Sequence, residues 1–168
     1  MKKVLVLGGT RFFGRKLVEL LIADGHDVTI VTRGKLANPF GDTVKHIIVD
    51  RRDTNAFSNV FEGQYYDIVY DNICYSPNEA KALCDIFNGK MGKLIFTSTL
   101  ATYDADGKAK SEADFDPYTY SIQMGDTEDF TYGEGKRQAE AVFFKYATCP
   151  VVAVRFPIVM GIDDYTER

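Results

Sequence analysis

The run from Val4 to Gly14, which reads VLVLGGTRFFG, constrains the fold of this chain most strongly. Its four leading apolar residues predict a strand buried on both faces, as in parallel sheets. The glycines that follow allow a sharp turn into a helix. Backbone N–H groups at such a turn and the positive end of the helix dipole both attract an anion, so a dinucleotide pyrophosphate is the expected occupant. The spacing is weak evidence by itself, because plain tight turns share it. The residues expected to line this cradle are Gly8, Thr10, Arg11, Phe12, Phe13 and Gly14.

Short apolar runs alternate with helical patterns along the rest of the chain. Five further strands are expected at 28–31, 44–49, 67–71, 94–96 and 151–155, and no internal repeat interrupts the alternation. This order predicts an α/β fold with a doubly wound parallel sheet of about six strands in the order 3-2-1-4-5-6.

Several helix boundaries carry local signals. Ser76, followed by Pro and by Glu three residues on, is a typical helix start, and Thr131 with Glu three residues on matches a capping box. Asp53 is suited to cap the helix before residue 61, and Gly25 to end the first helix. The first helix is expected to bury one stripe, formed by Phe13, Leu17, Leu20 and Leu21.

The tip of the second strand bears on the choice of cofactor. In a dinucleotide fold an acidic residue there accepts from the ribose 2′-hydroxyl, whereas an arginine suits a 2′-phosphate. Residues 32–35 read TRGK and contain no carboxylate. Arg33, together with Arg11 of the glycine turn, therefore predicts NADP rather than NAD. The alternative is that Arg33 and Lys35 are solvated loop charges.

Other polar residues fall where strands end. Asp50 and Arg51 follow the third strand and are expected to meet the adenine edge. The hydroxyls of residues 97–99, at the carboxyl end of the fifth strand, are candidates for the wall of the ligand crevice. The acidic, glycine-containing stretch 104–129 is longer than ordinary loops, and we interpret it as a lid over this crevice, with disorder as the alternative.

Tyr132 and Lys136 open the helix that follows the fifth strand. They stand four residues apart and so share one face of the helix. One such pair is expected by chance, and only its placement near Thr99 gives it weight. Gly133 and Gly135 disfavour a helix interior, but they let another surface approach closely.

Composition sets outer bounds. The chain has 168 residues, 45% of them apolar, which suits one domain with a full core. A net charge of −4 offers no basic footprint for nucleic acid, and no apolar run is long enough to span a membrane. Three cysteines, Cys74, Cys84 and Cys149, have no metal-ligand spacing, so we expect no metal site and reduced core thiols in a cytoplasmic protein.

The ordered set of motifs resembles the extended short-chain dehydrogenase/reductase superfamily, the NAD(P)-dependent sugar-nucleotide epimerases and dehydratases. The set comprises the glycine turn, Thr99, Tyr132-x-x-x-Lys136 and the run RFPIVMG at 155–161. Arg11 occupies the position where the glycine turn of this superfamily usually has its central glycine. In this respect the turn resembles that of a less typical branch of the superfamily. Members normally continue into a substrate domain. We therefore expect a dinucleotide-binding Rossmann domain over 1–160, and over 161–168 the start of a truncated or absent substrate domain.

The resemblance implies hydride transfer at a nicotinamide, on a hydroxyl or carbonyl of a small molecule such as a sugar nucleotide. Tyr132, assisted by Lys136, would be the general acid/base, and Thr99 would bind the substrate oxygen. Asn72 and Ile73 would line the cofactor, and Lys136 would hold its nicotinamide ribose. The fold family also implies a homodimer as an option. The alternative function is a non-catalytic NADP-binding or RNA-binding protein of the same fold.

Overall fold

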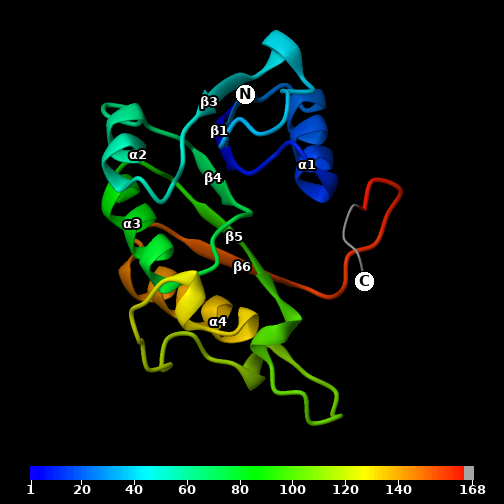
Figure 1. Cartoon of the computed structure of the whole chain (residues 1–168), viewed down its shortest axis with the longest axis vertical. Helices are drawn as coiled ribbons and strands as arrows, with labels where there is room; N and C mark the ends of the chain where they lie inside the picture. The colour runs from blue at the N-terminus through cyan, green and yellow to red at the C-terminus, as the bar shows by residue number, and fades with distance from the viewer. Residues whose placement is uncertain (165–168) are drawn as a thin grey trace.

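The computed structural model describes residues 1–164 and contains a six-stranded parallel sheet (Figure 1). Residues 165–168, the end of the segment expected to begin a substrate domain, lie outside the described residues. The strand order is β3-β2-β1-β4-β5-β6, which confirms the predicted doubly wound order. The strands are β1 (Lys3–Leu7), β2 (Asp27–Thr32), β3 (Lys45–Ile48), β4 (Ile68–Asp71), β5 (Leu94–Thr99) and β6 (Val151–Phe156).

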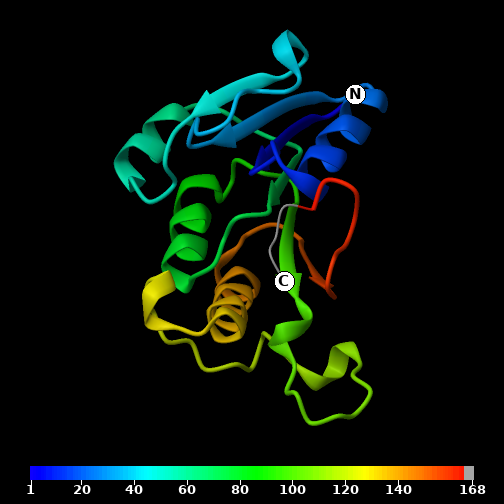
Figure 2. The ribbon, with the colours of Figure 1, turned by 45° about the vertical axis from the view of Figure 1, so that its right-hand side comes forward.

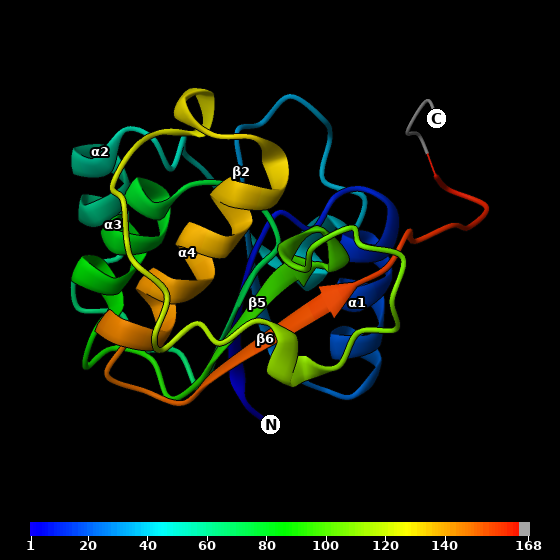
Figure 3. The ribbon, with the colours of Figure 1, turned by 90° about the horizontal axis from the view of Figure 1, so that it is seen from below.

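Helices cover the two faces of the sheet unequally (Figures 1 and 3). α1 (Phe12–Ala23) packs Val18 against Val4 and Ile30 on one face. The other face carries the larger core, in which residues from three helices meet β1, β4 and β5. These helices are α2 (Thr54–Val60), α3 (Pro77–Phe87) and α4 (Tyr132–Tyr146). Four short 3-10 turns complete the elements: η1 (Gly41–Thr43), η2 (Leu100–Thr102), η3 (Glu112–Asp114) and η4 (Thr127–Asp129).

The predicted helix caps are confirmed. The side chain of Ser76 accepts from the backbone N–H of Glu79, and the side chain of Thr131 accepts from that of Glu134. Asp53 caps α2, and Gly25 ends α1 with a φ of 74°. These local contacts satisfy backbone N–H groups that a helix start leaves without partners.

The predicted stripe of α1 is right for Leu21 and Leu17, which pack into the core, and wrong for Leu20. Gly14, Val18 and Leu21 are buried, whereas Leu20 is 65% exposed. The helix starts at Phe12, and the bare Gly14 lies against the carbonyl of Gly8. This close approach sets the buried face along Gly14 and Val18, which turns Leu20 toward solvent.

The segment 104–129 does not cover the crevice. It extends away from α1, as Figure 2 shows, and then returns along α4, as Figure 3 shows. The ring of Tyr118 lies 5.1 Å from that of Phe144, and the hydroxyl of Tyr120 donates to Glu134 at 2.9 Å. The lid interpretation is therefore wrong, because the aromatic residues of the segment anchor it to α4.

The two unusual glycines of α4 have the expected role. A Cβ on Gly133 would lie 2.6 Å from the carbonyl oxygen of Ala101, and a Cβ on Gly135 would overlap the carbonyl oxygen of Tyr75. The bare backbone thus brings the first turn of α4 against the segments that follow β4 and β5.

Candidate functional site

A cleft of about 580 Å³ lies at the carboxyl ends of β1, β2, β3 and β4. The carboxyl ends of parallel strands are where open α/β sheets bind ligands. The residues predicted to hold a cofactor outside α4 all line this cleft: Gly8, Thr10, Arg11, Phe12, Phe13, Gly14, Arg33, Asp50, Arg51, Asn72 and Ile73. Further lining residues that the sequence did not single out for the site include Thr32, Lys35, Leu36, Val49, Arg52, Tyr75 and Glu79.

The glycine turn forms one wall and is bare where a ligand would approach. Gly8 has a φ of 76°, and a Cβ there would lie 2.5 Å from Cγ2 of Ile73. A Cβ on Gly14 would lie 3.1 Å from the carbonyl oxygen of Gly8. Glycine is thus required at Gly8 both by backbone conformation and by space. The turn leads into the N-terminus of α1, so these residues fit an anionic group such as a pyrophosphate.

The turn also shows how Arg11 replaces a glycine. Arg11 has an extended backbone, with a φ of −132°, which any residue adopts. The left-handed conformation falls instead on Phe12, with a φ of 45°. Such a φ is uncommon outside glycine. The side chain of Arg11 is consequently tolerated at the cleft.

Cationic side chains mark the tip of β2. Arg33 and Lys35 are exposed and line the cleft. The hydroxyl of Thr32 accepts from the backbone N–H of Gly34 at 3.1 Å and contacts Nε2 of His46 at 2.8 Å. His46 of β3 therefore has a partner on the neighbouring strand β2.

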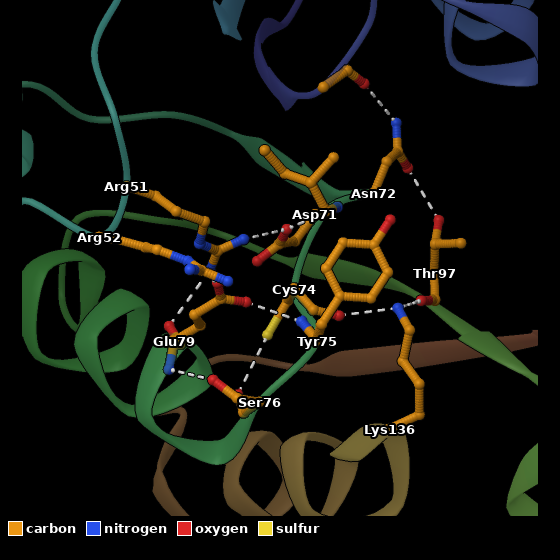
Figure 4. Close-up of polar contacts among 12 residues, drawn as sticks. Arg51, Arg52, Asp71, Asn72, Cys74, Tyr75, Ser76, Glu79, Thr97 and Lys136 are labelled. Atoms are coloured by element: carbon orange, nitrogen blue, oxygen red, sulfur yellow. Dashed lines mark hydrogen bonds and ion pairs between the residues drawn. The ribbon is translucent and has the colours of Figure 1, made fainter. Parts of the chain in front are cut away.

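Arg51, which was expected to meet the edge of the adenine, is buried beneath the surface of the cleft. Its guanidinium donates to Asp71 at 2.7 Å and to the carbonyl of Glu79 at 3.2 Å. Burial alone would lower the pKa of Arg51, but the Asp71 carboxylate outweighs it and raises that pKa. The Glu79 carboxylate in turn accepts from the backbone N–H of Tyr75 at 2.7 Å. The floor of the cleft is thus a fixed charge network (Figure 4).

The three residues expected to carry the chemistry lie outside the lining of the cleft. Lys136 is 1% exposed, and its Nζ donates to the carbonyl oxygens of Cys74 and Thr97 at 2.7 and 2.8 Å. Burial lowers the pKa of Lys136 to about 8. Tyr132 is 57% exposed, so the two residues of the motif lie at different depths. The hydroxyl of Thr99 accepts from the backbone N–H of Ala101 at 3.2 Å.

Tyr75 connects these residues with the cleft. Its ring lies 6.4 Å from that of Tyr132, and Nζ of Lys136 lies 4.5 Å from its centroid. Tyr75 itself lines the cleft. The sequence carries only a weak signal for this role, namely an aromatic residue shortly after the end of β4.

The hydroxyls of residues 97–99 do not form the wall of the cleft. Thr97 donates to Asn72 at 2.8 Å, Ser98 donates to Glu140 at 2.6 Å, and Thr99 caps the turn η2. None of the three residues lines the cleft, so the prediction of a hydroxyl-lined wall is wrong for this cleft, while the contact of Thr99 with a substrate stays a prediction.

The three cysteines lie within residues 1–164, and none of them forms a disulfide. Cys74 and Cys84 are buried, and burial raises the pKa of both thiols, that of Cys84 to about 12. No group of three or more His, Cys, Asp or Glu side chains that could hold a metal ion occurs among residues 1–164. None of the described helices has the length and apolar character needed to cross a bilayer.

The fold and the glycine-turn cleft define a nucleotide-binding domain of the Rossmann type. Residues 4–81 match the model of the NAD dependent epimerase/dehydratase family. Over these residues the chain is similar to this family.

Two curated relatives resemble the chain in sequence. A chloroplast stem-loop binding protein of 41 kDa from Arabidopsis thaliana is 30% identical over 61% of the chain and 30% of its own length. A UDP-glucose 4-epimerase from Neisseria meningitidis is 26% identical over 84% of the chain and 47% of its own length. The chain thus spans less than half of the length of either relative.

Solved structures share the fold. The Bordetella bronchiseptica enzyme WbmH, in complex with NAD⁺, is 14% identical with a TM-score of 0.73, over 99% of this chain and 59% of its own. A Thermus thermophilus UDP-glucose 4-epimerase in complex with NAD is 20% identical with a TM-score of 0.66, over 90% of this chain and 54% of its own.

Proposed function

We propose that the cleft binds NADP, with NAD as the alternative. The chain would thereby form the cofactor-binding part of an oxidoreductase, epimerase or dehydratase. The expected substrate is a small molecule with a reacting hydroxyl or carbonyl, a sugar nucleotide above all. The observation that carries the proposal is the bare glycine turn facing the cleft at the N-terminus of α1. Relatives named as UDP-glucose 4-epimerases, one of them solved with NAD, support a nicotinamide cofactor and a sugar-nucleotide substrate, whereas the preference for NADP rests on this chain's own residues.

The chain's own residues suggest how the cofactor would be held. The glycine turn and the first turn of α1 would bind the pyrophosphate. Asp50 and Ile73 flank the region proposed for the adenine, with Arg51 beneath it. Arg33 and Lys35 would meet a 2′-phosphate at the tip of β2. A carboxylate at this tip would disfavour the phosphate, and residues 32–35 contain none.

Tyr132 is assigned the role of general acid/base. A bound nicotinamide would supply hydride transfer. Tyr132 is exposed beside Tyr75, so a substrate that reaches the cleft from this side can contact its hydroxyl. Nζ of Lys136 lies 4.5 Å from the centroid of the Tyr75 ring, and its charge is assigned to assist Tyr132. Thr99 at the end of β5 is assigned to the substrate oxygen.

Calorimetric titration with NADPH and NADH tests the cofactor. We expect NADPH to bind about tenfold more tightly, because a charge-assisted contact to phosphate contributes at least that factor. The variant Arg33→Ala should lose this preference and keep its NADH affinity. Lys45→Ala, which removes an exposed cation of β3 outside the cleft lining, is the control. Tighter NADH binding, or an unaltered preference in Arg33→Ala, would overturn the NADP assignment.

Turnover tests the reaction. Nicotinamide absorbance is followed with a panel of nucleotide sugars, and epimers are separated by chromatography. Tyr132→Phe should reduce turnover by about 10²-fold or more, the usual contribution of a general acid/base. Turnover by Tyr132→Phe at the wild-type rate would remove Tyr132 from the mechanism.

RNA binding is the second candidate. It is favoured by the relative named as a chloroplast stem-loop binding protein and by the cations Arg11, Arg33 and Lys35 along the cleft. A gel-shift assay with a stem-loop RNA distinguishes it, because phosphate contacts weaken steeply with salt. Salt-sensitive RNA binding without hydride transfer would favour this candidate over the enzyme.

A further inference from the structure

Four hydrogen bonds connect the glycine turn with α4 (Figure 4). Nδ2 of Asn72 donates to the carbonyl oxygen of Gly8 at 2.8 Å. The hydroxyl of Thr97 donates to Oδ1 of the same Asn72 at 2.8 Å. Nζ of Lys136 then donates to the carbonyl oxygens of Thr97 and Cys74, at 2.8 and 2.7 Å.

Three of these bonds close a ring. The path runs from Asn72 along the backbone to Cys74, through the Lys136 ammonium to Thr97, and from the Thr97 hydroxyl back to Asn72. The ring ties the loop after β4 to the end of β5. Asn72 and Lys136 are 8% and 1% exposed, so breaking a member leaves a buried polar group without a partner.

Next to the ring, the Gly8 carbonyl sets which way the Asn72 amide points, and Thr97 holds the amide in that orientation. The oxygen and nitrogen of an amide have nearly the same shape, and only their partners distinguish them. The carbonyl oxygen of Gly8 can only accept, so Nδ2 faces Gly8, and the Thr97 hydroxyl donates to the remaining Oδ1. The space around Gly8 is tight, because its missing Cβ would lie 2.5 Å from Ile73, the neighbour of Asn72. A shift of this loop therefore reaches the glycine turn.

We propose that Thr97 is a positioning residue for the dinucleotide site, acting through Asn72 on Gly8. Its hydroxyl holds the Asn72 amide, and the amide holds the carbonyl of Gly8 and with it the shape of the turn. Lys136 anchors the same ring to α4, so the turn and the start of α4 are kept in one arrangement. This inference rests on the proposed function for its effect on cofactor binding.

Thr97→Val and Thr97→Ser separate the hydroxyl from the shape of the side chain. Thr97→Val should weaken NADPH and NADH binding about fivefold, the effect expected from one net hydrogen bond. Thr97→Ser retains the hydroxyl and should bind within about twofold of the wild type.

Thr102→Val is the matched control. Thr102 is 1% exposed, and its hydroxyl donates to the carbonyl of Thr99 at 2.9 Å, outside the ring. This variant should lower the urea midpoint by a similar amount to Thr97→Val, because each loses one buried hydrogen bond. Its dinucleotide affinity should remain within about twofold of the wild type.

Amide hydrogen exchange gives a readout that needs no ligand. In Thr97→Val the peptide covering residues 8–14 should exchange faster than in the wild type, and in Thr102→Val it should not. Unchanged exchange of this peptide in Thr97→Val would overturn the inference, as would equal losses of affinity in the two valine variants. Failure of the wild type to bind either dinucleotide would instead refute the proposed function, and the exchange data would still decide the role of Thr97.

Discussion

Nη1 of Arg51 lies 2.7 Å from Oδ1 of Asp71, and both side chains are almost fully buried. The two residues come from the loop after β3 and the end of β4, so their ion pair ties two walls of the cleft together. The second carboxylate oxygen of Asp71 is buried without a hydrogen-bond partner among the described residues. Asp71 is the main counter-charge of Arg51, and the Glu79 carboxylate adds to it.

Asp71→Asn should destabilise the protein by about 3 kcal/mol or more, because it leaves the Arg51 charge buried and uncompensated. Urea unfolding measures this change. Glu19→Gln, which breaks the exposed pair with Arg15, should leave the urea midpoint unchanged. The double variant Arg51→Met, Asp71→Leu should recover most of the stability, since no isolated charge remains. A double variant as unstable as Asp71→Asn would show that the charge is not the cause.

Gly135→Ala should lower stability although alanine is the better helix former. The added Cβ would overlap the carbonyl oxygen of Tyr75, and such overpacking costs about 1 to 3 kcal/mol, more than the gain of about 1 kcal/mol in helix propensity. Thermal unfolding provides the measurement. Asn55→Ala, at an exposed position of α2, gains propensity without the overlap and should raise the melting temperature slightly. A more stable Gly135→Ala protein would mean that α4 does not press against Tyr75.

Lys136 should make stability depend on pH in a defined window. Burial lowers its pKa from 10.5 to about 8 in the folded protein. Between these values the unfolded chain binds more protons, so the contribution of Lys136 to stability rises with pH and is lowest below about pH 8. Relative to Lys136→Met, the wild type should gain up to about 1.4 kcal/mol per pH unit across this window. Urea unfolding of both proteins at pH 7 and 9.5 tests the sign. A difference that stays constant or falls would contradict it.

Arg155→Lys should loosen the segment before η4. The guanidinium pairs with buried Glu140 and also donates to the carbonyl oxygens of Glu112 and Phe115, at 3.2 and 3.0 Å. Lysine keeps the charge but lacks the fork that reaches these groups together. We expect a loss of about 2 kcal/mol and faster amide exchange over residues 111–116. Lys110→Gln, which breaks a more exposed pair with Asp106, should leave the exchange of this peptide unchanged. Equal exchange in Arg155→Lys would assign the anchoring to other contacts.

Local sequence signals correctly predicted the helix caps and the strand order. Ser76 and Thr131 cap helices because their side chains need only a backbone N–H three residues away. The strand order followed from alternating elements and right-handed crossovers. The carboxyl ends of parallel strands meet at one edge of the sheet, so residues as distant in sequence as Arg11 and Asn72 were correctly expected to share the cleft.

Contacts between distant segments were not predictable in the same way. The burial of Arg51 depends on Asp71, twenty residues further along the chain, and no local pattern links them. Lys136 points between two carbonyl groups because Gly135 lets α4 approach Tyr75, which the helical period does not reveal. The role of segment 104–129 was misjudged because length alone does not tell which surface its aromatic residues contact.

The charge along the cleft has a kinetic consequence. The protein carries a net charge of −4, yet Arg11, Arg33 and Lys35 line the cleft. At physiological ionic strength fields are screened within a Debye length of about 8 Å. An anion close to the cleft is therefore drawn mainly by these three cations, while the distant acidic surface is screened. In dilute buffer the screening length grows, and the repulsion by the whole molecule reaches the approaching anion. The association rate of a negatively charged ligand thus depends on salt through two opposing fields, one local and one global.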